Sequence, residues 1–144
     1  MKILDFDPGH SSVTKGESLY DSVRTVDAIG AEVAVIRHSN NHYYDYLLAT
    51  GMLGLSVVNG GDGSGQHPSQ CMLDLMTIAE EFGHVDGLTV AISGDIAHSR
   101  VARSDAQILA RLGANVVFTG PSEWKNHYVT RLGTMATNNE VNAE

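Results

Sequence analysis

The feature that most constrains the fold of this chain is a regular alternation of short apolar runs with helical patterns. Apolar and often β-branched runs predict strands at residues 3–6, 33–36, 55–58, 89–93 and 116–119. Apolar residues at helical spacing predict helices over residues 17–29, 68–82 and 99–112, and a further helix capped by Asn40 or Asn41 and ending near residue 50. This order favours an α/β fold, in which parallel sheets with flanking helices are joined by right-handed crossovers.

Two local features predict how the elements are grouped. The run at 33–36 suits a strand that is buried on both faces. The glycine-flanked break at 83–87 predicts a boundary between two sheet units, at residues 1–82 and 83–144. Hydrophobic periodicity disappears from Lys125 onward, which predicts a polar tail over residues 125–144 without regular structure.

The composition excludes several classes of function. Seventeen acidic against nine basic side chains give a net charge of -8, which disfavours non-specific nucleic-acid binding. Cys71 is the only cysteine, so it cannot form an internal disulfide, and its apolar helical neighbours indicate packing rather than catalysis. No apolar run approaches the roughly 18 residues of a membrane span, and the start of the chain is unlike a signal peptide. We therefore expect a cytoplasmic protein with no membrane partner.

Polar side chains gather directly after the predicted strands, where open parallel sheets bind ligands. Lys15 follows the first strand, Arg37 the second, and His67 and Gln70 the third; Arg100 follows the strand at 89–93. Each has a simpler interpretation alone, such as a solvated charge or a helix-start histidine. Together they predict a site for a small anion.

Two motif families are not matched by this sequence. The glycine-rich stretch at 60–65 lacks both the GKS or GKT ending of a nucleotide P-loop and the dinucleotide-binding spacing. The seven histidines do not form the HExxH motif of metalloproteases, and we expect no metal site.

Four segments in series resemble the bacterial aspartate carbamoyltransferases. They are KGESL at 15–19, VIRH at 35–38, GDGSGQHPSQ at 61–70, and GDI with SRVARS between 94 and 104. The GDGSGQHPSQ block distinguishes this family from its ornithine-using relatives, and the resemblance extends from residue 1 to about residue 124. It implies transfer of a carbamoyl group from carbamoyl phosphate to L-aspartate, giving N-carbamoyl-L-aspartate and phosphate in pyrimidine biosynthesis.

The resemblance also implies roles for individual residues. Arg37 and His67 hold the carbonyl oxygen, with Arg37 also touching phosphate, and Gln70 accepts from the carbamoyl amide. Arg100 binds a carboxylate of aspartate, which a planar guanidinium matches better than lysine does. The family needs no metal or organic cofactor, because its catalysis depends on positioning and electrostatics.

The family's catalytic subunit is a homotrimer with shared sites, which implies that Ser11 and Lys15 serve the site of a neighbouring subunit. The family's Ser-Thr-Arg-Thr loop, its Arg-x-Gln segment and its HPxPR-like loop have no counterpart here, and Ala97 stands where relatives commonly carry Lys. We therefore expect parts of two linked Rossmann-like α/β domains. Residues 1–82 would be the second part of a carbamoyl-phosphate-binding domain with the interdomain helix, and residues 83–144 the first part of an aspartate-binding domain.

An incomplete site leaves two interpretations open for the chain alone. One is an enzyme segment that does not catalyse the transfer by itself. The alternative is a truncated, catalytically inactive carbamoyltransferase-like binding or assembly protein. An ornithine-type enzyme is a third and weaker possibility, which the GDGSGQHPSQ block disfavours.

Overall fold

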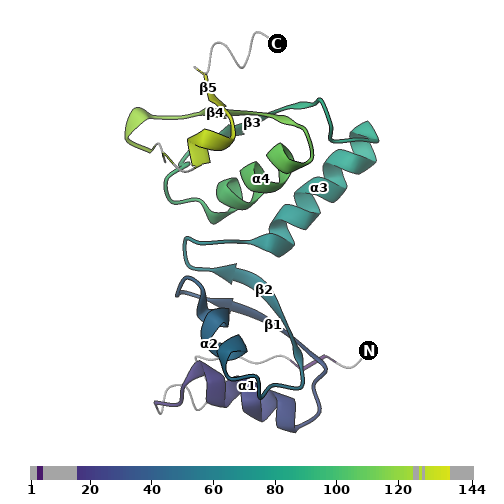
Figure 1. The fold of residues 1–144 in the computed structure, drawn as a ribbon, viewed down its shortest axis with the longest axis vertical. Coiled ribbons are helices and arrows are strands. Elements are labelled where there is room, and N and C mark those ends of the chain that lie inside the picture. Colours follow the sequence, from purple (N-terminus) through teal and green to yellow (C-terminus); the bar gives the residue numbers. More distant parts are fainter. Residues whose placement is uncertain (1–2, 5–15, 125–126, 128, 137–144) are drawn as a thin grey trace. The chain divides into compact units, whose positions relative to one another are not determined.

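The computed structural model describes residues 3–4, 16–124, 127 and 129–136, and their fold is α/β (Figure 1). The helices are α1 (Leu19–Ala28), α2 (Tyr43–Ala49), α3 (Pro68–Phe82) and α4 (Arg100–Arg111), with 3-10 turns η3 (Ser122–Trp124) and η4 (Val129–Leu132). The strands are β1 (Val33–His38), β2 (Ser56–Asp62), β3 (Thr89–Ser93), β4 (Asn115–Thr119) and β5 (Thr134–Met135).

The chain forms two compact units. Unit 1 contains the described residues up to Ile36 together with His42–Val58, and unit 2 contains Arg37–Asn41 and the described residues from Asn59 onward. The chain therefore passes from unit 1 into unit 2 twice, within β1 and within β2. The assignment of residues 1–82 and 83–144 to two substrate domains concerns function rather than compactness, and it stays a prediction.

Unit 1 packs α1 and α2 against the two-stranded sheet of β1 and β2. The first turn of α1 is closed by a capping box, in which the side chain of Ser18 accepts from the backbone of Asp21 and the Asp21 carboxylate accepts from Ser18 N. Its core consists of Val23, Tyr43, Leu47 and Leu55. The Tyr43 hydroxyl donates to Ile36 O at 2.8 Å, which satisfies the polar end of this buried ring.

Strand β1 is buried on one face only, which corrects the expectation of burial on both. Ala34 and Ile36 pack against the core of unit 1, whereas Val33 and Val35 are 57% and 71% exposed. Val58 on β2 is also 41% exposed. The β-branched residues of β1 were consistent with burial on both faces. No described element covers the face that carries Val33 and Val35, however, so these two side chains are exposed to solvent.

Unit 2 is built on a parallel sheet in the order β3-β4-β5. Val90 lies opposite Val116 and Ile92 opposite Phe118, with α4 connecting the two strands. Phe118 and Ala106 are fully buried at the centre of the core, and α4 packs against both β4 and α3 (Figure 1). Helix α3 ends at Gly83, whose left-handed φ of 75° suits glycine.

Three local predictions are corrected by the structure. The strand expected at 3–6 is not confirmed, because Ile3 and Leu4 are exposed and lie outside any strand, and residues 5–6 lie outside the described residues. The cap of α2 is His42 rather than Asn40 or Asn41. The tail predicted to be irregular contains η4 and β5, and two residues of β5 pair with β4, too few to show hydrophobic periodicity.

A separate expectation concerned membranes. Among the described residues, no helix is both long and apolar enough to cross a bilayer.

Candidate functional site

The end of β1 lies against the glycine-rich loop that follows β2, and both belong to unit 2. Gly63 N donates to His38 O at 2.9 Å, and Ser64 N donates to Asn41 Oδ1 at 2.9 Å. These two bonds fix the segment that carries Arg37 beside the loop. An arginine at the carboxyl end of one strand and a loop at the carboxyl end of the next are thus brought to one place, as the sequence predicted.

The loop is closed from within by Asp62, a fully buried carboxylate. Asp62 Oδ1 accepts from Gln66 N at 2.7 Å and from Asn59 Nδ2 at 3.0 Å. A Cβ atom at Gly65 would lie 2.5 Å from Asp62 Oδ2, closer than carbon and oxygen approach without a shift. The glycine at this position is therefore required by the turn itself and is not by itself a sign of phosphate binding.

His67 caps the start of α3 with its ring. Its Nδ1 accepts from the backbone N–H of Gln70 at 3.4 Å, and Pro68 occupies the first helical turn, where no N–H is needed. The backbone N–H of His67 donates to Ser104 Oγ at 2.9 Å, which ties the start of α3 to α4. A neutral ring whose Nδ1 is an acceptor carries its proton on Nε2, so the free edge of His67 is a hydrogen-bond donor.

The surroundings of His67 favour that neutral form. Burial lowers the pKa of His67 below its ordinary value, and the positive charges of Arg100 and Arg37 lower it further. At neutral pH the imidazole is therefore uncharged, and two guanidinium groups are close enough to act on it. Such an arrangement suits an oxygen that becomes negative during a reaction.

Arg100 is held by the glycine-rich loop. It is the first residue of α4, after the N-cap Ser99, and its Nη1 donates to Gly63 O at 3.0 Å. A Cβ atom at Gly61 would lie 3.0 Å from Arg100 Cζ, so the guanidinium packs directly on the loop backbone. A single bond to Gly63 leaves further N–H groups of Arg100 for an anionic ligand.

Gln70 lies in the first turn of α3, and its Nε2 donates to Asp74 Oδ1 at 3.1 Å. Because an amide is planar, this bond turns Oε1 away from Asp74 and leaves it available as an acceptor. The structure thus brings Arg37, His67, Gln70 and Arg100 together in unit 2. The other two predicted site residues, Ser11 and Lys15, lie outside the described residues.

Sequence reasoning missed the residues that hold this arrangement together. Asp62 and Ser104 were seen only as members of longer motifs, and Asp74 was not singled out. The four-residue spacing of Gln70 and Asp74 on one helix was a signal for that pair. No sequence signal pointed to Ser104, whose Oγ donates to Gln66 Oε1 at 2.6 Å across 38 residues.

No group of three or more His, Cys, Asp or Glu side chains suited to a metal ion occurs within the described ranges. Cys71 is buried in α3, in agreement with the packing interpretation. Burial raises the pKa of its thiol to about 12, and the neighbouring Asp105 contributes to the same shift. The thiol is therefore protonated at neutral pH and a poor nucleophile.

Comparison with known proteins gives consistent matches. Residues 1–80 match the model of the family described as "Aspartate/ornithine carbamoyltransferase, carbamoyl-P binding domain". The chain is 54% identical over 141 residues to the aspartate carbamoyltransferase catalytic subunit of Enterococcus faecalis (strain ATCC 700802 / V583), covering 98% of this chain and 46% of that protein. It is 57% identical over 141 residues to the corresponding subunit of Pediococcus pentosaceus, with the same coverage.

Solved structures agree with the sequence matches. The aspartate transcarbamoylase of Trypanosoma cruzi in complex with carbamoyl phosphate matches with a TM-score of 0.83 at 30% identity, over 94% of this chain and 47% of that one. The same enzyme in complex with carbamoyl phosphate and aspartate matches with a TM-score of 0.81 at 30% identity, over 94% of this chain and 48% of that one. The chain spans about half the length of the curated relatives it matches.

Proposed function

Because the chain belongs to the aspartate/ornithine carbamoyltransferase family, we propose that its site serves carbamoyl transfer from carbamoyl phosphate to L-aspartate. The products are N-carbamoyl-L-aspartate and phosphate, and the reaction is a step of pyrimidine biosynthesis. The choice of aspartate is supported by the GDGSGQHPSQ block at residues 61–70 and by relatives named as aspartate enzymes. We place this activity in the cytoplasm.

The observation that carries the proposal is that Arg37 and Arg100 both lie close enough to His67 for their charges to favour its neutral form. Attack of the aspartate amine on the carbamoyl carbon moves negative charge onto the carbonyl oxygen before phosphate leaves. His67 Nε2–H and the Arg37 guanidinium donate to that oxygen, and Arg37 also contacts the departing phosphate. Donors that are fixed in advance stabilise the developing charge without rearranging, which is how such sites lower barriers.

Gln70 and Arg100 orient the two substrates. Gln70 Oε1 accepts from the carbamoyl NH2 group, since Nε2 of the same amide is bonded to Asp74. The N–H groups of Arg100 that are not bonded to Gly63 bind a carboxylate of aspartate. Gln70 and Arg100 both act by positioning a substrate. A mechanism that combines this positioning with the donors His67 and Arg37 requires no covalent intermediate and no cofactor.

We further propose that complete sites form between subunits of a homotrimer. Ser11 and Lys15 would reach the phosphate in a neighbouring subunit's site. Residues 1–82 would belong to the carbamoyl-phosphate-binding domain and residues 83–144 to the aspartate-binding domain. The family model supports the first assignment, because its match ends at residue 80.

A second candidate is a binding or assembly protein that keeps the fold without turnover. Such a protein would need the fold and the substrate contacts, but not a complete set of catalytic groups. The intact set of Arg37, His67, Gln70 and Arg100 favours the enzyme instead. A histidine whose pKa is lowered by burial and by two nearby arginines is typical of a functional site.

Carbamoyl-aspartate formation decides between the two candidates. It is measured for the 144-residue chain and for a completed chain, which joins this sequence to the flanking segments of a close relative. We expect transfer by the completed chain and little or none by the 144-residue chain. Each charged hydrogen bond missing from the site costs roughly 1.5–3 kcal/mol, and two missing clusters imply orders of magnitude in rate. An inactive completed chain would favour the binding protein, and ordinary turnover by the 144-residue chain would refute the incomplete site.

A further inference from the structure

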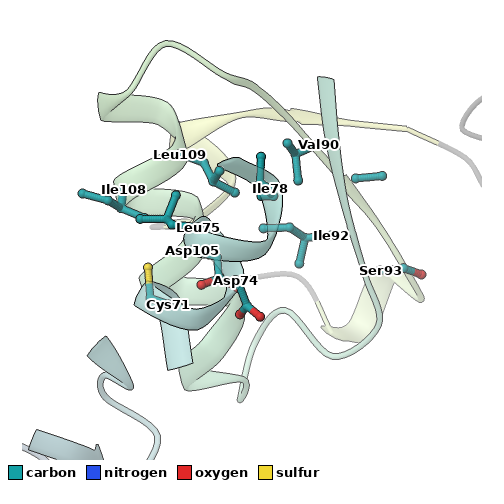
Figure 2. A pocket seen from close by; sticks show the side chains of 11 residues that line it. Cys71, Asp74, Leu75, Ile78, Val90, Ile92, Ser93, Asp105, Ile108 and Leu109 are labelled. Carbon is teal, nitrogen blue, oxygen red and sulfur yellow. The ribbon is translucent and has the colours of Figure 1, made fainter. Parts of the chain in front are cut away.

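Helices α3 and α4 and strand β3 line a half-open pocket of about 280 Å³, which has an apolar end and a polar end (Figure 2). One end is apolar and is lined by residues such as Ile78, Val90 and Leu109. At the other end lie a thiol and two carboxyl groups, from Cys71 and Asp74 on α3 and from Asp105 on α4. Two acidic side chains from different helices in one half-buried space are unusual, because burial without a counter-charge is costly.

Asp74 connects this pocket to the proposed site. Its Oδ1 accepts from Nε2 of Gln70, one helical turn earlier, at 3.1 Å. Because the nitrogen end of the Gln70 amide is engaged there, the oxygen end faces away. A carboxylate can only accept at this contact, so Asp74 selects one of the two orientations of the Gln70 amide.

Asp105 is the proton-holding member of the pair. Burial is the main cause that raises the pKa of Asp105 to about 6; the Cys71 thiol opposes this rise, and the neighbouring Asp74 contributes to it. Asp74 and Asp105 line the same end of the pocket, and two neighbouring carboxyl groups can hydrogen-bond to each other only when one of them carries a proton. Within the described chain Asp105 Oδ1 is buried without a hydrogen-bond partner, and an unpartnered oxygen is less costly on a neutral carboxyl than on a carboxylate.

We propose that Asp74 is a positioning residue for Gln70, and that a proton shared between Asp74 and Asp105 controls how firmly it holds the Gln70 amide. With the proton present, the two carboxyls attract each other and α3 and α4 are joined beside the amide. Without it, two like charges face each other and the Asp74 carboxylate shifts. The importance of Gln70 for transfer depends on the proposed function, whereas the linkage between Asp105 and the Gln70 amide does not.

Other titratable groups lie near Asp74 and Asp105, and their effects on the Gln70 amide must be distinguished from the effect of this pair. On α3 the second group is the Cys71 thiol, which stays protonated well above neutral pH. At the cap of α3 is His67, whose ring contacts the backbone of Gln70 and whose pKa is lowered by burial, Arg100 and Arg37. From β3 the pocket receives Ser93, which does not titrate in this range. His67 is therefore the group among these whose titration must be distinguished from that of Asp105.

Side-chain amide NMR of the 144-residue chain tests the linkage without any substrate. The sequence has three glutamines, Gln66, Gln70 and Gln107, so ¹⁵N labelling of glutamine gives a simple spectrum. We expect the Gln70 amide signals to shift with a midpoint near pH 6. Gln66, whose amide hydrogen-bonds with Gln107 and Ser104, serves as the internal control for general pH effects.

Three variants make the result decisive. Asp105→Asn should remove the midpoint of the Gln70 signals, and Asp86→Asn, which changes an exposed aspartate of the same unit, should leave it in place. Asp74→Ala should move the Gln70 signals towards those of a free side chain. A midpoint that persists in Asp105→Asn would assign the change to His67 and overturn the proposal, as would a Gln70 amide that does not respond in the parent. The parent and Asp105→Asn decide the question even if Asp74→Ala does not fold.

Discussion

His67 has three roles, one of its backbone and two of its ring. Its backbone N–H bonds to Ser104, its Nδ1 caps α3, and its Nε2 is left as a donor. A substitution therefore removes a cap as well as a proposed catalytic donor, and the two effects must be measured separately. Loss of a helix cap lowers stability by about 1 kcal/mol, whereas loss of an oxyanion donor lowers turnover.

In a completed chain, His67→Ala should lower kcat on the order of a hundredfold or more, with a much smaller effect on the binding of carbamoyl phosphate. The reason is that the oxygen opposite Nε2 becomes more negative during attack, so the bond is stronger in the transition state than in the ground state. Steady-state kinetics give kcat, and a direct binding measurement gives the dissociation constant of carbamoyl phosphate. His84→Ala, which changes an exposed histidine, is the control. Equal kcat values for variant and parent would return His67 to a structural role.

The raised pKa of Asp105 also makes a prediction about stability. Folded Asp105 has a pKa of about 6 and an ordinary aspartate one of 3.8, so between these values the folded chain binds more protons than the unfolded chain. The stability contributed by Asp105 is then fully present below pH 3.8, and it is lost as the pH rises through about 6. His67 acts in the opposite direction, because its folded pKa is lowered.

Comparison of parent and variant isolates the contribution of Asp105 from that of His67. Between pH 4.5 and 7 the parent should lose stability relative to Asp105→Asn, with a difference in slope of at most about one bound proton per molecule. Urea unfolding at a series of pH values measures it. Parallel curves for the two proteins would show that Asp105 does not hold a proton in the folded chain.

At the scale of elements, the glycine-rich loop is the part whose geometry is most strictly determined by sequence. Gly65→Ala should destabilise the chain by about 1–3 kcal/mol, because the new Cβ would overlap the buried carboxylate of Asp62. Thermal or urea unfolding measures the change. Ser64→Ala is the matched control in the same loop, since its side chain is exposed and makes only a long bond of 3.4 Å with Asn41. Similar stability for Gly65→Ala and the parent would mean that the loop moves to accept a side chain.

Elements with long apolar patterns were predicted well from the sequence, and those that depend on partners were not. The pattern over 68–82 gave α3 with its bounds, because a proline start, a glycine end and helical spacing agree there. The two-residue β5 was missed because it exists only through pairing with β4. Arg37, His67 and Gln70 could be placed together because the ends of neighbouring strands meet in one sheet, whereas Arg100 follows a strand of the other sheet. The bond from His67 to Ser104, 37 residues later, left no local trace.

At the scale of the whole molecule, the proposed shared site predicts complementation between damaged subunits. Completed chains with Lys15→Ala and completed chains with Arg37→Ala should each form nearly inactive homotrimers. Mixed trimers should regain activity, because a site that takes Lys15 from one subunit and Arg37 from the next can be intact. Activity is measured after reassembly, with mixed trimers verified by native mass spectrometry.

The control for this experiment mixes Arg37→Ala with His67→Ala. Both residues lie in unit 2 of one chain, so no combination of these subunits restores an intact site. Recovery in the first mixture and none in the second supports the shared site. Equal recovery in both, or none in either, is incompatible with it.

The double crossing of the chain between its two units has a genetic consequence. Unit 2 takes Arg37–Asn41 from a stretch that is separated from the rest of unit 2 by His42–Val58. A gene segment starting at Asn59 would encode the loop, His67, Gln70 and Arg100, but not Arg37, whose charge acts on His67. The shortest uninterrupted coding stretch for the described site therefore runs from residue 37 to residue 100. Recombination or gene splitting within that interval would separate residues that act together, whereas a breakpoint just outside it would transfer the group intact.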